Sequence, residues 1–346
     1  MAISKIGGVS LSSLSKLFGV PLSNITKIGG VDKQPSGEIF EWINPLSGYS
    51  WFMGVIDRDR RTLWWLDNTQ NIRKTDIYTL QTISYPTNAN ADSGLNDNGY
   101  TEVVATHWGY WEQSYLYRLN KTTGQLTTVF LDYNGRKQNT VNEDDWTYFF
   151  IPSCEKDTNI GVVLKSNNSY SEISILGATY TTQRDGANNY FWTVRGTYSG
   201  YPLTLIKIDA TTKTIVATYD VPNNYAGIPF VYYNDYLYLL NSGTTNFMRF
   251  KISNGTFETL PSCPVNTLTD IYYGCNNIYN NKLYVGKTGA SNDGKLYYYD
   301  LNLNQWNYDT IPYSSTDFRL QKVSSTGEMV IFDTANQKVY IRKKIL

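Results

Sequence analysis

Several residue types that carry enzyme chemistry are scarce in this 346-residue sequence. A single histidine, His107, excludes a metal site built from several histidines and leaves one candidate for histidine-based acid–base catalysis. The three cysteines (Cys154, Cys263 and Cys275) are widely spaced, with no Cys-x-x-Cys pair, so we expect buried small apolar residues. No phosphate-binding loop, dinucleotide-binding glycine pattern or Gly-x-Ser-x-Gly occurs. The sequence therefore predicts no enzyme, no metal and no cofactor.

Charge and long apolar runs are scarce as well. Only 17% of the residues are charged, and 30 basic residues balance 30 acidic ones, so nothing indicates a bulk attraction to nucleic acid or to an anionic membrane. No stretch approaches the roughly 18 apolar residues of a membrane span. The first residues lack the apolar core of a secretory signal peptide. We expect a protein that binds no nucleic acid and does not insert into a membrane.

What the sequence has in abundance favours β-structure. Its 30 tyrosines, together with threonine and valine, suit pleated, half-buried surfaces. Asparagine and glycine suit the turns between strands. We predict an all-β fold.

One strand–turn–strand unit recurs along the chain. It is clearest at 230–260, where Asn234-Asp235 and Asn254-Gly255 are typical hairpin turns between alternating strands. Equivalent strands recur every 43 to 51 residues, starting near Trp51, Glu102, Thr147, Tyr190, Tyr236, Lys282 and Glu328. Seven such units over 38–346 predict a β-propeller of about seven four-stranded blades. Six or eight blades remain open, because 101–131 and 132–176 match the unit least well.

Two of the units resemble kelch repeats. Within residues 230–311 the sequence reads Asn-Lys-Leu-Tyr-Val at 281–285, Leu-Tyr-Tyr-Tyr-Asp-Leu at 296–301 and Asn-Gln-Trp at 304–306. The paired glycines of that family after the second strand are missing. The resemblance implies a kelch-like propeller and says nothing about activity.

The last unit holds three predicted strands, at 318–323, 328–332 and 338–345. A propeller usually closes when the opposite terminus completes the last blade. Either a segment before Glu38 supplies the missing outer strand, or an open edge remains that the charged residues Arg342-Lys343-Lys344 protect.

Residues 1–37 form a different repeat, which we predict to be a separate arm preceding a propeller at 38–346. Three copies follow each other at a spacing of 11 residues, at 3–9, 14–20 and 25–31. Glycine in every copy argues against a helix, because an interior glycine costs about 1 kcal/mol there. Each copy is too small to bury its own apolar residues, so we expect the arm to dock on its own propeller, on the arms of neighbouring subunits or on a different protein. The predicted assembly-binding residues are Ile3, Lys5, Ile6, Val9, Leu14, Lys16, Leu17, Val20, Ile25, Lys27, Ile28 and Val31.

The arm resembles the short Ser-Lys-Ile-x-Gly-Val repeats at the starts of some tailed-bacteriophage virion proteins. This resemblance implies a structural, tail- or capsid-associated component of a virion, with other virion proteins and copies of itself as partners. It also implies assembly in the host cytoplasm, and the missing signal peptide agrees with this. A glycan on the host surface is a further candidate ligand. The alternatives are a carbohydrate-binding propeller and a polysaccharide-cleaving propeller enzyme.

Other features have a structural and a functional interpretation. Asp57-Arg-Asp59 and Glu143-Asp-Asp145 are local carboxylate clusters. The oxygen-rich stretch 88–99 is expected to be a solvated loop rather than a calcium site. The tryptophans Trp64, Trp65, Trp108 and Trp111 are expected between blades rather than on a sugar-binding platform. Polar insertions at 86–99, 132–145 and 178–189 are the predicted recognition loops.

Overall fold

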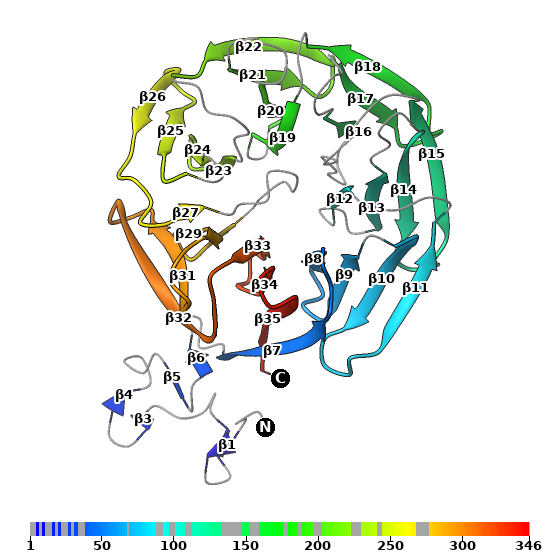
Figure 1. Cartoon of the computed structure of the whole chain (residues 1–346). Helices are drawn as coiled ribbons and strands as arrows, with labels where there is room; N and C mark the ends of the chain where they lie inside the picture. The colour runs from blue at the N-terminus through cyan, green and yellow to red at the C-terminus, as the bar shows by residue number, and fades with distance from the viewer. Residues whose placement is uncertain are drawn as a thin grey trace.

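The structure, a computed structural model, consists of β-sheets arranged like blades around a central axis (Figure 1). It describes residues 5–6, 9–10, 16–17, 20–21, 27–28, 31–33, 39–67, 69–87, 93–96, 101–107, 113–132, 147–152, 159–175, 179–185, 188–196, 203–222, 230–240, 244–267 and 277–345. None of these residues is helical. The all-β, seven-bladed propeller predicted from the repeat is confirmed.

The first three blades follow each other along the chain, and in each the earliest described strand is innermost (Figure 1). Blade 1 contains β8 (Met53–Ile56), β9 (Thr62–Leu66), β10 (Asn71–Asp76) and β11 (Thr82–Pro86). Blade 2 contains β12 (Ser93–Asn96), β13 (Glu102–His107), β14 (Ser114–Asn120) and β15 (Leu126–Asp132). The described strands of blade 3 are β16 (Tyr148–Ile151), β17 (Asn159–Leu164) and β18 (Tyr170–Ser174).

Blades 4 to 6 repeat the same antiparallel order. Blade 4 contains β19 (Thr179–Arg184), β20 (Tyr190–Arg195), β21 (Thr204–Asp209) and β22 (Thr214–Asp220). Blade 5 contains β23 (Phe230–Tyr233), β24 (Tyr236–Leu240), β25 (Phe247–Lys251) and β26 (Thr256–Thr259). Blade 6 contains β28 (Ile278–Tyr279), β29 (Lys282–Tyr284), β31 (Asp293–Asp300) and β32 (Gln305–Ser315).

Blade 7 joins the two ends of the chain. Its inner three strands are the last of the sequence, β33 (Phe318–Val323), β34 (Met329–Asp333) and β35 (Lys338–Lys344), and its outer strand is β7 (Ile39–Ser47). Beside β33 the sheet continues into the short strands β30 (Lys287–Thr288) and β27 (Asn266–Thr267). The closing strand therefore begins directly after Glu38, and the prediction that it precedes this residue was wrong.

The predicted repeat positions agree with the blades except at the first. Glu102, Tyr190, Tyr236 and Lys282 begin the second strand of their blades, and Thr147 and Glu328 directly precede β16 and β34. Trp51, by contrast, lies before the innermost strand of blade 1, whose second strand starts at Thr62. Both β8 and β9 are buried along their whole length, so no alternation of polar and apolar residues distinguished them.

Two predicted loops are partly strand. Residues 93–96 form β12, the innermost strand of blade 2, within the stretch expected to be a solvated loop. Residues 179–184 form β19, the innermost strand of blade 4, within a predicted insertion. Both strands are rich in serine, threonine, asparagine or glutamine, and this composition resembles that of a loop. The insertion at 133–145 lies outside the described residues.

The core lies between the blades. Among the described residues, seven clusters of buried apolar side chains occupy the seven spaces between neighbouring blades. Successive residues of a second strand point to opposite neighbours: Leu237 and Leu239 pack toward blade 4, whereas Tyr238 and Leu240 pack toward blade 6. Strands buried on both faces need continuous apolar sequence, and large aromatic side chains fill the wedge between them. This requirement explains the aromatic content of the sequence.

A tight turn between the third and fourth strands of a blade can also contact the neighbouring blade. In blade 5 the turn after β25 ends at Gly255, which has a left-handed φ of 71° and donates its N–H to the carbonyl of Lys251. A Cβ atom at Gly255 would lie 2.8 Å from Cε1 of Tyr219, on the outer strand of blade 4. The predicted Asn254-Gly255 turn is thus confirmed, and it also brings two blades into contact.

We expect Gly255→Ala to destabilise the propeller more than Gly289→Ala. Both glycines have positive φ, so each substitution carries a left-handed penalty of about 1–2 kcal/mol. Only at Gly255 does the new methyl group collide with a neighbouring blade, because nothing lies within 4 Å of the corresponding position at Gly289. Denaturant unfolding followed by tryptophan fluorescence would compare the two variants. Equal losses of stability would show that the collision of the new methyl group with Tyr219 adds nothing to the destabilisation.

Candidate attachment site

The repeats of the arm are small β-hairpins. Each pairs two residues with two others at the same register: β1 (Lys5–Ile6) with β2 (Val9–Ser10), β3 (Lys16–Leu17) with β4 (Val20–Pro21), and β5 (Lys27–Ile28) with β6 (Val31–Lys33). In each case two residues, the second always glycine, separate the closing pair. Glycine in the second loop position is what such short hairpins favour. The expectation of a non-helical arm is confirmed for the described strands.

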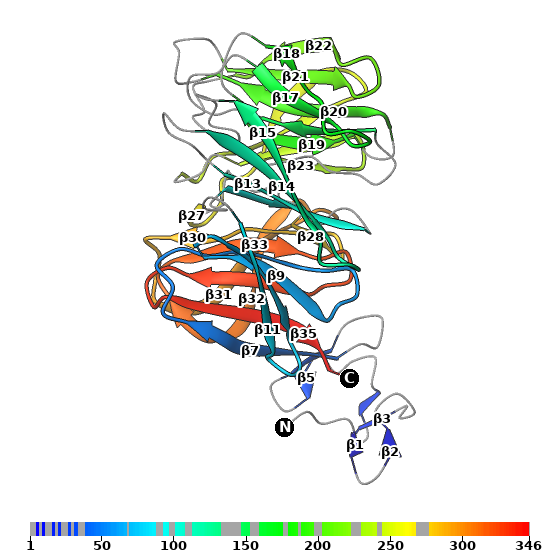
Figure 2. The same cartoon turned by 90° about the vertical axis from the view of Figure 1, so that its right-hand side faces the viewer.

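The third hairpin belongs to the sheet of blade 7. Strand β6 pairs antiparallel with β7, Asp32 opposite Phe40 and Lys33 opposite Ile39. The sheet therefore ends at β5, two strands beyond the propeller's own outer strand. The other two hairpins form separate two-stranded sheets, and Figures 1 and 2 show them outside the ring of blades.

The predicted assembly-binding residues are placed as follows. Nine of the twelve lie in hairpin strands, at equivalent register positions: Lys5, Ile6, Val9, Lys16, Leu17, Val20, Lys27, Ile28 and Val31. Ile3, Leu14 and Ile25 lie outside the described residues. The burial of these side chains against another chain stays a prediction.

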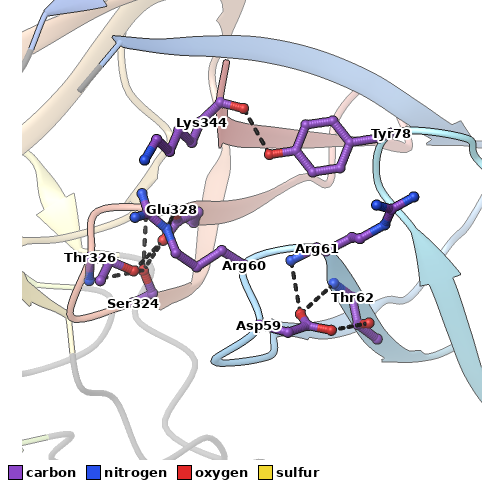
Figure 3. A network of polar contacts seen from close by, with 9 residues as sticks. All are labelled: Asp59, Arg60, Arg61, Thr62, Tyr78, Ser324, Thr326, Glu328 and Lys344. Atoms are coloured by element: carbon purple, nitrogen blue, oxygen red, sulfur yellow. Dashed lines mark hydrogen bonds and ion pairs between the residues drawn. The ribbon is translucent and has the colours of Figure 1, made fainter. Parts of the chain in front are cut away.

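A cluster of four side chains holds the closing strand, and we refer to it as the closure lock: Phe40, Arg60, Glu328 and Arg342. Phe40 on β7 is almost fully buried, with the guanidinium of Arg342 4.6 Å and that of Arg60 5.9 Å from its ring centroid. Arg60 also donates from Nε to Glu328, whose side chain is completely buried (Figure 3). Cations above an aromatic face are stabilised, more strongly when water is excluded.

The lock joins three parts of the chain. Arg60 comes from the turn between the first two strands of blade 1, where it has a left-handed φ of 60°. Glu328 precedes β34 and accepts hydrogen bonds from the hydroxyls of Ser324 (2.5 Å) and Thr326 (2.6 Å). Blade 1 is thereby fixed to blade 7 at the point where β7 enters.

A second contact ties down the end of the last strand. The hydroxyl of Tyr78, in blade 1, donates to the carbonyl of Lys344 at 2.8 Å (Figure 3). Burial, and then the charge of Glu328, raises the pKa of Tyr78, so the phenol stays a donor at neutral pH. Nζ of Lys343 lies 4.3 Å from the Tyr78 ring centroid and 3.3 Å from a carboxylate oxygen of Glu41. The lysines at 343–344 thus hold β7 and blade 1 to the last strand.

The antiparallel order gives the propeller two different ends. Connections between first and second strands, and between third and fourth strands, lie at one end, while all others lie at the opposite end. Strand β7 is a fourth strand, so its first residue lies at the first of these ends, together with Lys344. The arm therefore leaves the propeller there. The connections from Arg195 to Thr204 and from Asp220 to Phe230 belong to the opposite end.

The carboxylates of the first candidate catalytic cluster stabilise local structure. Asp57 accepts from Nε1 of Trp64 (2.9 Å) and pairs with Lys121 (3.0 Å). Burial alone would raise the pKa of Asp57, but these partners outweigh it and lower the pKa. Asp59 accepts from the N–H groups of Arg61 and Thr62 at 2.8 Å each. The Glu143-Asp-Asp145 cluster lies outside the described residues.

The other candidates are buried. Trp64 and Trp65 are each 1% exposed and pack toward blades 2 and 7, as expected for core residues. His107 is buried at the end of β13, stacked on Tyr115 at a centroid distance of 6.2 Å. Burial raises the pKa of Cys263 to about 12, so its thiol is unreactive at neutral pH. Trp108, Trp111, Cys154 and Cys275 lie outside the described residues.

Two searches concern ions and membranes. Within the described ranges, no three His, Cys, Asp or Glu side chains are grouped so that they could hold a metal ion. A search of the same residues finds no helix with the length and apolar character needed to cross a membrane.

Comparison with known proteins identifies the fold. No family model and no curated protein matches the sequence. Solved structures do match: the β-propeller domain of Cps50 (Swd1) from Myceliophteria thermophila has a TM-score of 0.65 at 10% identity, over 88% of this chain and 99% of that one. The WD40 repeats of RRP9 (TM-score 0.60, 12% identity, 91% and 100% covered) and U3-55K (0.59, 12%, 88% and 98%) also match. None of the nine tryptophans is followed by aspartate, so the likeness is one of architecture.

We expect Arg60→Leu to destabilise the protein strongly, whereas Arg61→Leu should leave its stability nearly unchanged. Loss of Arg60 removes the cation from a carboxylate that is fully buried, and breaking such a pair costs about 3–5 kcal/mol. Arg61 pairs with Asp76 at the surface, where solvent screens the interaction. Thermal denaturation of the two variants would measure the difference. A milder effect at position 60 than at 61 would contradict the closure lock.

Proposed function

We propose that this protein is a non-enzymatic attachment module, a propeller head held in a larger assembly by its N-terminal arm. One observation carries the proposal: the third hairpin extends the closing blade by strand pairing, while two hairpins of nearly the same sequence form sheets of two residues per strand. An isolated two-stranded hairpin is at best marginally stable in water. The first two hairpins therefore need a partner surface.

The two ends of the propeller allow attachment and ligand binding to take place on different surfaces. The arm leaves at the end of the short turns, so binding there leaves the opposite end accessible. That opposite end carries longer connections, such as 196–203 and 221–229, whose sequences together contain three tyrosines and two asparagines. Such residues supply adaptable polar contacts and large contact areas in recognition loops. We propose that a protein partner, or a glycan on a host surface, binds at that end.

We propose further that the assembly is a bacteriophage virion, with other virion proteins as partners and assembly in the host cytoplasm. The support is the resemblance of the arm to repeats at the starts of tailed-phage virion proteins. The kelch-like character of blades 5 and 6 is likewise a proposal, supported by the strand sequences at 281–285 and 296–301.

Removing residues 1–33 should abolish assembly and leave the propeller folded. The truncated chain keeps β7, and therefore all the strands that close the ring. Particles from the source culture would be examined by immunogold labelling and co-sedimentation, with tagged full-length and truncated chains compared. We expect only the full-length chain to sediment with the particles. Normal incorporation of the truncated chain would overturn the attachment role of the arm.

We expect no glycan turnover by the purified protein. The His107→Ala variant should also keep any activity in assembly, because this side chain is a buried stacking partner of Tyr115. Reducing-sugar and mass-spectrometric assays on bacterial polysaccharides would measure hydrolysis or elimination. Products that disappear in the His107→Ala variant would show that the protein is an enzyme.

A further inference from the structure

The hydrogen-bonding direction of each arm residue follows from the register of its hairpin. In the third hairpin a loop of two residues connects Ile28 to Val31, which form the last pair before the turn. In a hairpin of this kind the last pair exchanges its backbone hydrogen bonds within the hairpin. The next pair, Lys27 and Asp32, then directs its N–H and C=O groups away from the hairpin. Each hairpin therefore has one outward-directed residue on each strand.

The contact with blade 7 confirms this alternation independently. The carbonyl of Ile39 accepts from the N–H of Ile345 at 2.8 Å, so the backbone groups of Ile39 point toward β35. Those of the next residue, Phe40, point to the other side, toward Asp32. Asp32 is thus the residue through which the third hairpin docks.

The equivalent positions differ in the other two hairpins. Hairpin 1 has Ser10 at this position, and hairpin 2 has Pro21. Ser10 has both the N–H and the C=O group that point outward from the hairpin, as Asp32 does in the third hairpin. Pro21 has no N–H, and proline at such a position is a common way to block an exposed strand edge. Hairpin 1 can therefore repeat the docking of the third hairpin, and hairpin 2 cannot repeat it in full.

The sheet of blade 7 offers an edge for such docking. It ends at β5, where Lys27 is the outward-directed residue. Two β5 edges from two copies would place Lys27 opposite Lys27, and like charges directly opposite each other are destabilising. Pairing of β5 with β2 places Ser10 opposite Lys27, without this repulsion.

We propose that the arm links copies of this chain head to tail: β2 of one copy, through Ser10, adds to the open β5 edge of the next copy. This inference rests on the proposed function and names one partner of the arm. A contact between two different surfaces of one chain generates rings or filaments.

Proline substitutions test the proposal without removing the arm. Ser10→Pro deletes the outward N–H of β2, and hairpin 2 already accommodates proline at this position. Lys27→Pro deletes the outward N–H of β5. The control is Pro21→Ser, which alters the same register position of hairpin 2. Size-exclusion chromatography with light scattering would give the mass of each full-length protein over a range of concentrations.

We expect the wild type and Pro21→Ser to assemble, and Ser10→Pro and Lys27→Pro each to remain at the monomer mass of 39.5 kDa. An equimolar mixture of these two variants should double its mass, because one variant keeps the β2 edge and the other keeps the β5 edge. Unchanged thermal melting of the propeller would show that both variants are folded.

A wild type that stays monomeric at every concentration would overturn the proposal, as would assembly of Ser10→Pro equal to that of the wild type. A mixture of the two variants without any mass increase would exclude head-to-tail pairing. If a monomeric wild type still sediments with particles, the attachment function stands and the arm binds a different protein.

Discussion

The structure depends on the pairing of β7 with β35, which closes the ring. Seven blades pack face to face only if the last one is complete, because every blade buries both of its faces against its neighbours. The N-terminal strand supplies the outer edge of blade 7, and Phe40 inserts the aromatic ring on which Arg342 and Arg60 stack. Around this ring a buried carboxylate, that of Glu328, is bonded to a cation and two hydroxyls. Such a group is tolerated in the core only when it is fully satisfied, so the lock also specifies how blade 1 meets blade 7.

Local pattern was sufficient to predict most of the fold. The turn at Asn234-Asp235 was readable because two consecutive left-handed residues require these side chains, and the structure gives φ values of 45° and 67° there. The regular spacing of the second strands was readable because each begins after a short polar turn. The predicted position for blade 1 was displaced by one strand, since β8 and β9 are both buried along their whole length and a turn rich in charged residues separates them.

Long-range features could not be read in the same way. Nothing in the sequence near Ile39 states that it pairs with residues close to position 345, because strand pairing leaves no local trace of the partner. The same holds for Arg60 and Glu328, which lie 268 positions apart and resemble any pair of surface charges in the sequence. The repeat of the arm was visible, but the pairing of its third copy with β7 was not, since three nearly identical copies carry no sign of which one docks.

Closure of the ring and docking of the third hairpin use the two edges of one strand. The inner edge of β7 pairs with β35, and its outer edge pairs with β6 of the third hairpin. In a chain whose ring has not closed, β7 lacks the sheet that holds it extended, so the platform for the third hairpin is absent too. Docking of the arm is therefore coupled to completion of the propeller. Tension on the arm would act along β7, across all its hydrogen bonds to β35 together. The attachment that we propose for the arm would therefore carry a folded head and resist its separation from the assembly.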